Sequence, residues 1–266
     1  MRVVVTGATG FIGTTLCAAL AAERHEPLPL DLKIAGERLQ FDGADAVVHL
    51  APVTVALTEK VGRAAAAAGA QIVFMSSVKV HGEESDAALT ELARIAPRSA
   101  YAESKARSED ALRAIAGLRL AVLRPPLVYG PGVKANFLAL TRVLARGLPL
   151  PLGGVANRRS LLYVGNLASA VLRVMTSAHA AGRSYLVSDG PPVSTPELCC
   201  RLATALGRNA RLFPVPVSLL ELVPGAKRLT RSLEVDDAAL RRELAWRAAF
   251  SLEQGLRATA EWYLTR

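Results

Sequence analysis

Residues 3–13 read VVVTGATGFIG, a continuous apolar run that leads directly into a glycine turn. Such a run is typical of a strand that is buried on both faces of a parallel sheet. Gly7, Gly10 and Gly13 recur every third residue, and an alanine-rich segment of helical composition follows them. Glycines at a strand-to-helix turn let the backbone approach a pyrophosphate, which would lie at the helix N-terminus. The stretch predicts a dinucleotide-binding α/β unit, with an ordinary strand-to-helix turn as the alternative.

An acidic residue ends the next apolar stretch. Asp31 lies 18 residues after Gly13, where a carboxylate can accept hydrogen bonds from the ribose hydroxyls of adenosine. Because this carboxylate would repel a 2′-phosphate, NAD is the expected cofactor and NADP is less favoured. Lys33 could soften that preference, and a plain turn residue is the alternative interpretation of Asp31.

The connection after this acidic residue is unusually short. Residues 32–44 alone separate it from the next apolar run at 45–51, whereas an extra strand with two parallel crossovers needs more chain. We therefore expect the third strand of a doubly wound sheet to be absent or vestigial. The other possibility is that the printed chain omits a flexible segment. Pro27 and Pro29 fit an edge strand, because proline cannot donate to a sheet ladder.

Hydroxyl and amine side chains follow at positions suited to chemistry. Ser76 and Ser77 end the apolar run QIVFMSS, and ligand-binding groups gather at the carboxyl ends of parallel strands. Tyr101 and Lys105, in SAYAESKARSED, are spaced i, i+4 and so share a helix face. An ammonium beside a phenol is expected to lower the pKa of the phenol, which suits proton transfer to a hydroxyl or carbonyl. Strand-end caps and a solvated helix face are the alternatives.

Later segments also carry structural signals. The connection at 53–70 is long enough for one helix, and 159–175 predicts a strand and helix that return to the main domain. A last strand is expected at 183–190. Ser194 or Thr195 followed by Pro196 predicts a helix start. Two more helices are expected near the C-terminus, with the tryptophans Trp246 and Trp262 as packing residues.

Five ordered motifs carry a family resemblance: TGATGFIG, SSVKVHG, YAESK, LRPPLVYGPG and NRRSLLYVGNLASA. Together they resemble the extended short-chain dehydrogenase/reductase family, in its nucleotide-sugar epimerase and 4-keto-reductase branch. The resemblance implies a Rossmann-type doubly wound parallel sheet with a smaller C-terminal α+β substrate domain. It further implies a homodimer formed through the helix that carries Tyr101. We expect an NAD-binding domain at 1–125, completed by about 160–190, and a substrate-binding domain at 126–159 and 191–266.

The same resemblance implies roles for individual residues. Ser77, Tyr101 and Lys105 would form a catalytic triad, and Lys105 would also bond to the nicotinamide ribose. Asn136 and Arg159 would contact the diphosphate of the nucleotide-sugar substrate. Ser77 and Tyr101 would contact its sugar. An arginine fork suits phosphate oxygens. The residues expected to bind the cofactor are Gly7, Gly10, Phe11, Ile12, Gly13, Asp31, Leu50, Ala51, Tyr101, Lys105 and Pro125.

The resemblance points to an NAD-dependent enzyme that epimerises C4 of a UDP-sugar through a 4-keto intermediate. An NAD(P)H-dependent 4-keto-sugar reductase and a non-catalytic nucleotide-binding homologue remain alternatives. Family members that eliminate water carry an Asp-Glu pair directly after the hydroxyl residue of the serine motif. This chain has Val78 and Lys79 there, which disfavours a dehydratase.

Composition restricts other function classes. The net charge is +9, from 32 Lys and Arg against 23 Asp and Glu, but no run of five basic residues occurs and aromatics are 5%. We therefore expect no nucleic-acid partner. The three cysteines lack metal-ligand spacing, so no metal is expected. With no apolar stretch near twenty residues and no room for a signal peptide before residue 3, we expect a cytoplasmic protein without a membrane partner.

Overall fold

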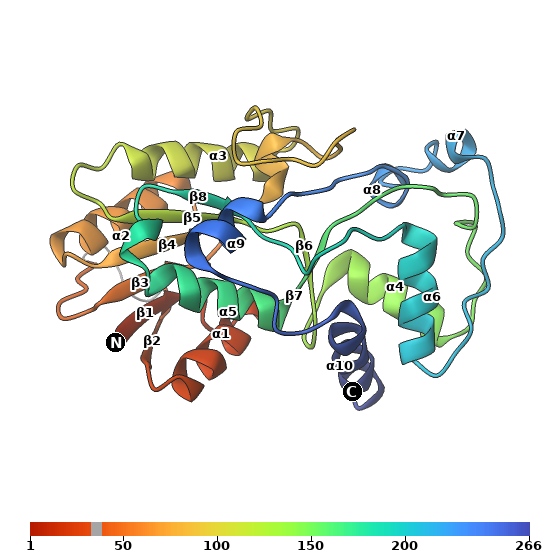
Figure 1. The fold of residues 1–266 in the computed structure, drawn as a ribbon, viewed down its shortest axis with the longest axis horizontal. Helices are drawn as coiled ribbons and strands as arrows, with labels where there is room; N and C mark the ends of the chain where they lie inside the picture. Colours follow the sequence, from red (N-terminus) through yellow and green to blue (C-terminus); the bar gives the residue numbers. More distant parts are fainter. Residues whose placement is uncertain (33–38) are drawn as a thin grey trace.

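The computed structural model describes residues 1–32 and 39–266, and its larger half is a six-stranded sheet covered by helices (Figure 1). Neighbouring strands are parallel, in the order β2-β1-β3-β4-β5-β8. The strand order reverses between β1 and β3, and the ligand crevice of such sheets lies at that point, outside the carboxyl ends of the strands. The strands are β1 (Arg2–Thr6), β2 (Glu26–Leu30), β3 (Ala46–His49), β4 (Gln71–Met75), β5 (Leu120–Arg124) and β8 (Ser184–Leu186).

Alternate residues of these strands point to opposite faces of the sheet, and each face has its own helices. Val3 and Val5 pack in one buried cluster with α1 and α5, whereas Val4 packs in another with α2 and α3. The doubly wound parallel sheet expected from the sequence is therefore confirmed. These helices are α1 (Phe11–Ala22), α2 (Val55–Ala67), α3 (Ala100–Arg113) and α5 (Val164–Met175).

Strand β2 is an edge of the sheet, because it pairs with β1 and with no other described strand. Pro27 and Pro29 both lie in it, so their missing N–H groups remove no bond from a central ladder. Within the described residues no strand stands between β2 and β3. The expected loss of the third strand is confirmed to that extent, while Lys33 lies outside the described residues.

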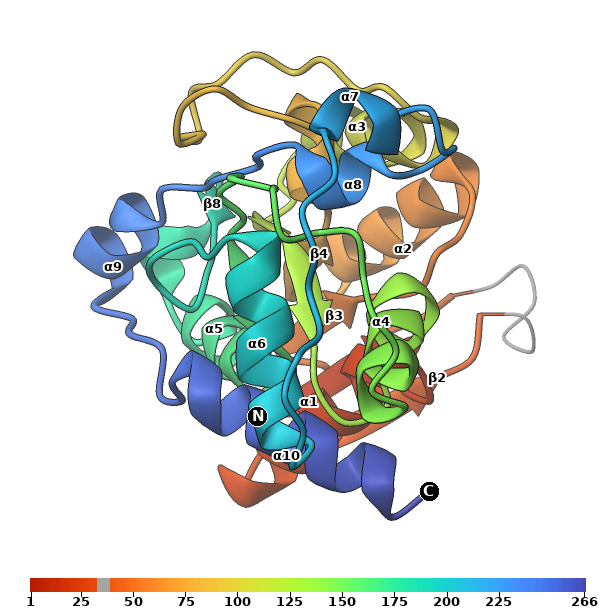
Figure 2. The same cartoon turned by 90° about the vertical axis from the view of Figure 1, so that its right-hand side faces the viewer.

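The smaller half has a two-stranded parallel sheet and a core of its own. Phe137, Leu202 and Leu256 are buried together there, one from each of three helices that Figure 2 views from the outer end. The strand expected within 159–175 is present, but it pairs with β6 and not with the large sheet, whereas the helix after it does cover the large sheet. These elements are β6 (Leu127–Tyr129), β7 (Leu161–Tyr163), α4 (Ala135–Ala145), α6 (Thr195–Ala205) and α10 (Leu252–Leu264).

The C-terminal predictions are confirmed at the level of elements. Ser194 caps α6 by accepting a hydrogen bond from the N–H of Glu197, as the helix-start signal predicts. Two helices follow near the end of the chain, α9 (Ala238–Leu244) and α10. Trp246 is buried beside α9 in the core of the large sheet, and Trp262 is partly buried in the small half.

The division into two domains stays a prediction. Helix α9 falls in the segment assigned to the substrate domain, yet its Leu240 and Leu244 pack in the core of the large sheet. Among the described residues, no helix is both long enough and apolar enough to cross a membrane. The short helical turns are η1 (Val78–His81), η2 (Ala178–Ala180), α7 (Val217–Leu220) and α8 (Lys227–Thr230).

Candidate active site

The glycine turn between β1 and α1 forms an anion-binding helix start. Gly7 has a φ of 72°, a conformation in which a residue with a side chain would be strained. Gly10 caps α1 without any side-chain hydrogen bond, and the first turn has no acidic residue. The N–H groups of Phe11, Ile12 and Gly13 therefore lack intrahelical acceptors and favour an anion such as a pyrophosphate.

Gly13 has a different purpose, which is close packing. A Cβ atom at this position would lie 2.2 Å from the carbonyl oxygen of Gly7 and 2.6 Å from the Cα of Ala8. Both obstacles are backbone atoms, so no side-chain rotation can relieve them. Only glycine lets α1 approach the strand-end turn this closely.

We predict that Gly13→Ala lowers the free energy of unfolding by about 1–3 kcal/mol, because the added methyl group forces α1 away from the turn. Gly10→Ala is the matched comparison, since its Cβ would meet only the Gly7 carbonyl oxygen, at 3.2 Å. Urea unfolding followed by circular dichroism measures both. Equal stability of the two variants would show that the tight packing at Gly13 is not significant.

The other predicted cofactor residues also follow strand ends. Asp31 directly follows β2 and is exposed, Leu50 and Ala51 follow β3, and Pro125 follows β5. A Cβ on Gly7 would lie 3.1 Å from the backbone nitrogen of Ala51, so the loops after β1 and β3 touch. The structure thus gathers these residues at one edge of the sheet, and their role in cofactor binding stays a prediction.

The predicted triad comes together where β4 ends and α3 begins. Ser77 follows β4 in an extended backbone conformation and is buried. Ser99 caps α3, whose first residues include Tyr101. Tyr101 is half exposed, and its hydroxyl lies close enough to the Ser77 side chain for Ser77 to oppose the rise in its pKa that burial causes. A hydroxyl pair at the rim of the sheet can contact a ligand oxygen from both sides.

Lys105 lies one turn after Tyr101 on α3 and is buried. Its ammonium group donates a 2.7 Å hydrogen bond to the carbonyl oxygen of Met75 and lies 4.8 Å from the centre of the Phe74 ring. Burial lowers the pKa of Lys105 to about 8, although the charge of Glu109 opposes the shift. The amine is therefore held at the end of β4 and is poised to change charge near neutral pH.

The predicted effect of this lysine on the tyrosine is wrong for this structure. Burial raises the pKa of Tyr101, and the Ser77 side chain lowers it only in part. The reason is geometric, because the lysine ammonium is bonded to the Met75 carbonyl oxygen. In this arrangement the group that favours the phenolate is Ser77 and not Lys105.

Sequence reasoning missed a histidine under the site. His49 ends β3, is fully buried, and lies between the hydroxyls of Thr6 at 2.6 Å and Thr58 at 3.2 Å. Burial, followed by the charge of Lys105, lowers the pKa of His49 to about 3. It therefore stays neutral and ties β1, β3 and α2 together. Its only sequence signal is a polar residue at the end of an apolar run.

A buried ion pair also escaped the sequence analysis. Glu109, on α3, accepts hydrogen bonds from Arg124 at 2.5 and 3.0 Å and from the Ser76 hydroxyl at 2.5 Å. Burial favours a raised pKa for Glu109, but the hydrogen bonds and charge of Arg124 and the donors Ser76 and Arg113 hold its pKa below the usual range. The carboxylate fixes α3 to β5 directly behind the predicted triad.

The predicted substrate residues lie toward the small half. Asn136 is exposed in the first turn of α4, next to Ala135, which has a strained φ of 52°. Arg159 is half-buried, donates a 2.9 Å hydrogen bond to the Arg231 carbonyl oxygen and lines a cavity of about 290 Å³. Among the described residues, no hydrogen bond or ion pair joins either side chain to the triad, so their roles stay predictions.

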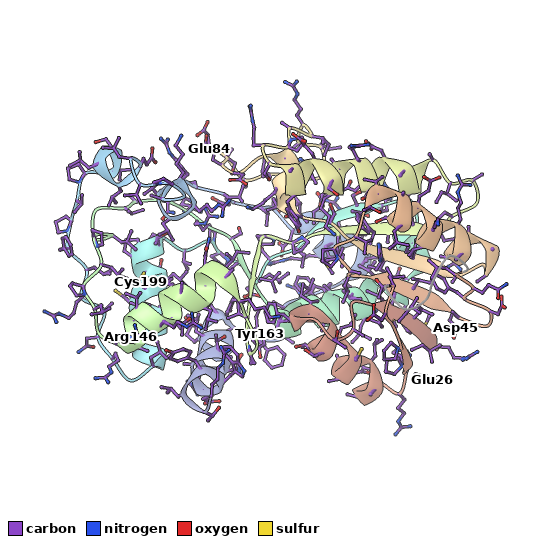
Figure 3. The ribbon with its side chains drawn as sticks, turned by 180° about the vertical axis from the view of Figure 1, so that it is seen from behind. Glu26, Asp45, Glu84, Arg146, Tyr163 and Cys199 are labelled. Atoms are coloured by element: carbon purple, nitrogen blue, oxygen red, sulfur yellow. The ribbon has the colours of Figure 1, made fainter. Side chains whose placement is uncertain are left out.

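A second cavity, of about 410 Å³, lies between the turn after Ser77 and helix α8. Burial lowers the pKa of Arg159, and the negative charge of Glu83, which lines this cavity, opposes that shift. Figure 3 shows Tyr163 where the two halves meet. The cavity is lined by His81, Gly82, Glu83, Glu84, Ala96, Arg98, Lys227, Arg228 and Arg231.

The structure thus contains the glycine turn after β1, the hydroxyls of Ser77 and Tyr101, and the buried amine of Lys105. Comparison with known proteins shows which family has this site. The model of the NAD dependent epimerase/dehydratase family matches residues 3–188. The chain belongs to this family. That range contains the glycine turn, Ser77, Tyr101 and Lys105, so the sequence-based recognition is confirmed.

Epimerase/dehydratase relatives cover most of the chain. A UDP-glucose 4-epimerase of Vibrio cholerae is 31% identical, covering 98% of this chain and 95% of its own length. That alignment runs over 312 positions, more than the 266 residues of this chain, so the relative has segments that this chain lacks. A ceramide reductase of Caulobacter vibrioides is 31% identical over 63% of this chain and 58% of its own length.

A solved structure shares the fold over the full length of the chain. The dTDP-glucose 4,6-dehydratase of Bacillus anthracis, determined in complex with NAD, matches with a TM-score of 0.81 and 20% identity. The match covers 100% of this chain and 97% of the dehydratase. The epimerase/dehydratase fold is therefore retained here despite the shortened connections.

Proposed function

We propose that the chain is an NAD-dependent nucleotide-sugar epimerase that acts at C4 of a UDP-sugar. The observation that carries this proposal is the meeting of the Ser77 and Tyr101 hydroxyls at the carboxyl end of β4, with the Lys105 ammonium held at the Met75 carbonyl oxygen of the same strand end. A hydroxyl pair in this position can bind one sugar oxygen and exchange a proton with it. The UDP-glucose 4-epimerase that aligns along nearly the whole chain supports the choice of substrate class.

NAD fits the residues that would hold it. The free N–H groups at the start of α1 suit the pyrophosphate, and the positive φ of Gly7 forms the turn that presents them beyond the end of β1. Asp31 follows β2 at the position expected to bind the adenosine ribose. When bound, NAD supplies hydride acceptance from the sugar carbon and hydride return to it.

The residues of the chain would handle the proton. Tyr101 takes the proton of the 4-hydroxyl as C4 becomes a ketone, and it returns that proton when C4 is reduced on the opposite face. Because burial raises its pKa, Tyr101 rests as the phenol, which is the form that protonates a reduced ketone oxygen. The Ser77 hydroxyl favours the phenolate needed for the oxidation half, and it orients the sugar oxygen.

We also propose that Asn136 and Arg159 bind the diphosphate of the nucleotide. The guanidinium of Arg159 can pair with two phosphate oxygens at once, although one of its N–H groups is engaged with the Arg231 carbonyl oxygen. The NAD-binding and substrate-binding domains would follow the expected division. The homodimer through α3 remains part of the proposal, and sedimentation of the purified protein tests it.

Asp31 should set the preference for NAD over NADP. We predict that Asp31→Asn lowers the ratio of NAD affinity to NADP affinity by roughly 10- to 100-fold, because a charged hydrogen bond to the ribose is lost and the repulsion of a 2′-phosphate is removed. Calorimetric titration with each cofactor measures the ratio. Asp42→Asn, on the exposed connection to β3, is the control and should leave it unchanged.

A dehydratase is disfavoured by the residues after Ser77. Val78 is buried, and the Lys79 ammonium pairs with Glu83 at 3.2 Å, so the expected Asp-Glu pair is replaced by an apolar and a basic side chain. A 4-keto-sugar reductase remains the second candidate, because one relative is named as a ceramide reductase. It would use Ser77 and Tyr101 for the reduction half alone.

The test begins by identifying any cofactor that copurifies with the protein. UDP-glucose and, in a separate assay, a UDP-4-keto-sugar are then supplied with and without added reduced cofactor, and both the sugar and the cofactor are quantified. Interconversion of C4 epimers without net cofactor consumption supports the epimerase. Reduction of a UDP-4-keto-sugar with equimolar cofactor consumption would instead identify a reductase, and the lack of saturable NAD binding at millimolar concentration would identify a non-catalytic homologue.

A further inference from the structure

The segment at 211–229 covers the outer end of the small half, where Leu212, Val217 and Leu220 pack partly buried against the core, but none of its side chains is fully buried. It reads RLFPVPVSLLELVPGAKRL and is therefore rich in apolar residues despite its exposure. Phe213, Leu219, Leu222 and Val223 are 46%, 56%, 78% and 61% exposed. In Figure 2 the segment crosses the face turned toward the viewer, forms α7 at the top and continues into α8. Such a concentration of exposed apolar side chains is typical of an interaction site.

Backbone hydrogen bonds hold the start of this segment against the protein. The N–H of Leu150 donates to the Arg211 carbonyl oxygen at 2.8 Å, and the N–H of Phe213 donates to the Leu150 carbonyl oxygen at 3.1 Å. Leu148, two residues from this bridge, is also exposed, at 47%. The apolar side chains are thus presented from a bonded scaffold at the outer end of the small half.

The positive charge of the protein is concentrated in the same half. Residues 126–163 and 189–232 contain eleven Lys and Arg but three Asp and Glu, whereas the remainder of the chain is balanced to within one charge. Two of those three carboxylates are engaged in ion pairs, Glu197 with Arg201 and Glu221 with Arg231. The third, Asp189, accepts hydrogen bonds from the backbone of Tyr163. Little negative charge is left to offset the basic side chains.

Several of the basic side chains lie beside the apolar ones. Arg146 ends α4 just before Leu148, and Figure 3 places it at the far end of the small half from the large sheet. Arg208 and Arg211 precede Phe213 and are exposed. Within the described residues, none of these three arginines has an ion-pair partner. We call the outer face formed by residues 146–148 and 208–223 the basic apolar face.

We propose that the basic apolar face binds the surface of an anionic lipid membrane. Aliphatic side chains would enter the boundary between headgroups and acyl chains, while the flanking arginines contact anionic headgroups. A second copy of the chain is disfavoured as the occupant, because the unpaired arginines of two such faces would repel each other. The expectation of no membrane partner rested on the lack of a spanning stretch, and peripheral attachment requires none.

Vesicle flotation tests this proposal with the full chain. Vesicles of equal parts phosphatidylcholine and phosphatidylglycerol should carry the protein upward, and vesicles of phosphatidylcholine alone should bind it much more weakly. The variant L219S/L222S/V223S should lose most of the binding. Leu92→Ser is the matched control, since Leu92 is 96% exposed on a different loop, and it should bind like the original protein.

Charge is tested separately. The variant R146Q/R208Q/R211Q should bind anionic vesicles about fivefold more weakly for each arginine replaced. R24Q/R107Q/R247Q removes the same charge from exposed positions elsewhere and should have a much smaller effect. No binding to anionic vesicles, or equal losses in both charge variants, would overturn the proposal. So would self-association of the original protein that L219S/L222S/V223S abolishes, because the face would then bind a second copy.

Discussion

Replacing Tyr101 by phenylalanine should lower turnover about 10²- to 10⁴-fold, the usual contribution of a positioned acid or base. The substitution removes the hydroxyl that lies beside Ser77 and leaves the ring in place at the start of α3. NAD affinity should therefore change little, because the predicted pyrophosphate site is at α1. Steady-state turnover of the UDP-sugar and calorimetry with NAD measure the two effects separately.

Tyr263→Phe is the control, since this tyrosine lies near the end of α10 and packs with the small half. It should retain full turnover. Near-normal turnover of Tyr101→Phe would reject the assigned proton transfer, whatever reaction the protein performs. A joint loss of turnover and NAD binding would instead place Tyr101 in cofactor binding alone.

The second large effect is expected behind the site, at the buried carboxylate. Glu109 and Arg124 are 1% and 4% exposed, and they are joined by two hydrogen bonds. Glu109→Gln leaves the arginine charge buried without its counterion, so we expect a loss of about 3–5 kcal/mol in the free energy of unfolding. Urea unfolding measures the loss. Turnover should fall as well, because Glu109 fixes the helix that carries Tyr101.

Glu59→Gln is the matched control, because the Glu59–Arg63 pair spans one helical turn at the surface and should contribute about 0.5 kcal/mol or less. Two variants of equal stability would contradict the importance assigned to the buried pair. The acid response gives a second measure. With a pKa held below its usual range, Glu109 stabilises the fold above the ordinary glutamate pKa, and this stabilisation is lost as the pH falls through the lowered value. Glu109→Gln should lack that component.

The parts of the fold that could be predicted are those determined by residues close together in the sequence. The apolar run and glycine spacing of 3–13 specify β1, its turn and α1, because strand burial and close backbone approach both act on neighbouring residues. Pro27 and Pro29 identified an edge strand, since each removes a backbone donor. The spacing of Tyr101 and Lys105 placed both on one helix, as found in α3.

The remainder depends on contacts between residues far apart in the chain. Nothing near Glu109 in the sequence reveals that Arg124 and Ser76 meet it, because α3, β5 and β4 must pack first. The pKa of Tyr101 was misjudged for the same reason. Its spacing from Lys105 was right, but the ammonium bonds to Met75, 30 residues earlier. Predicting that β7 pairs with β6 likewise required knowing that these two strands, about 30 residues apart in the sequence, lie side by side in the fold.

The most direct test of the proposed C4 epimerisation follows the hydrogen at that carbon. UDP-glucose carrying deuterium at C4 is incubated with the protein, and the epimer formed is analysed by mass spectrometry and nuclear magnetic resonance. Removal and return of the hydrogen within one site predicts that the product retains deuterium at C4, with no net consumption of cofactor. Loss of the label to solvent, or a product formed only with stoichiometric reduced cofactor, would contradict the account.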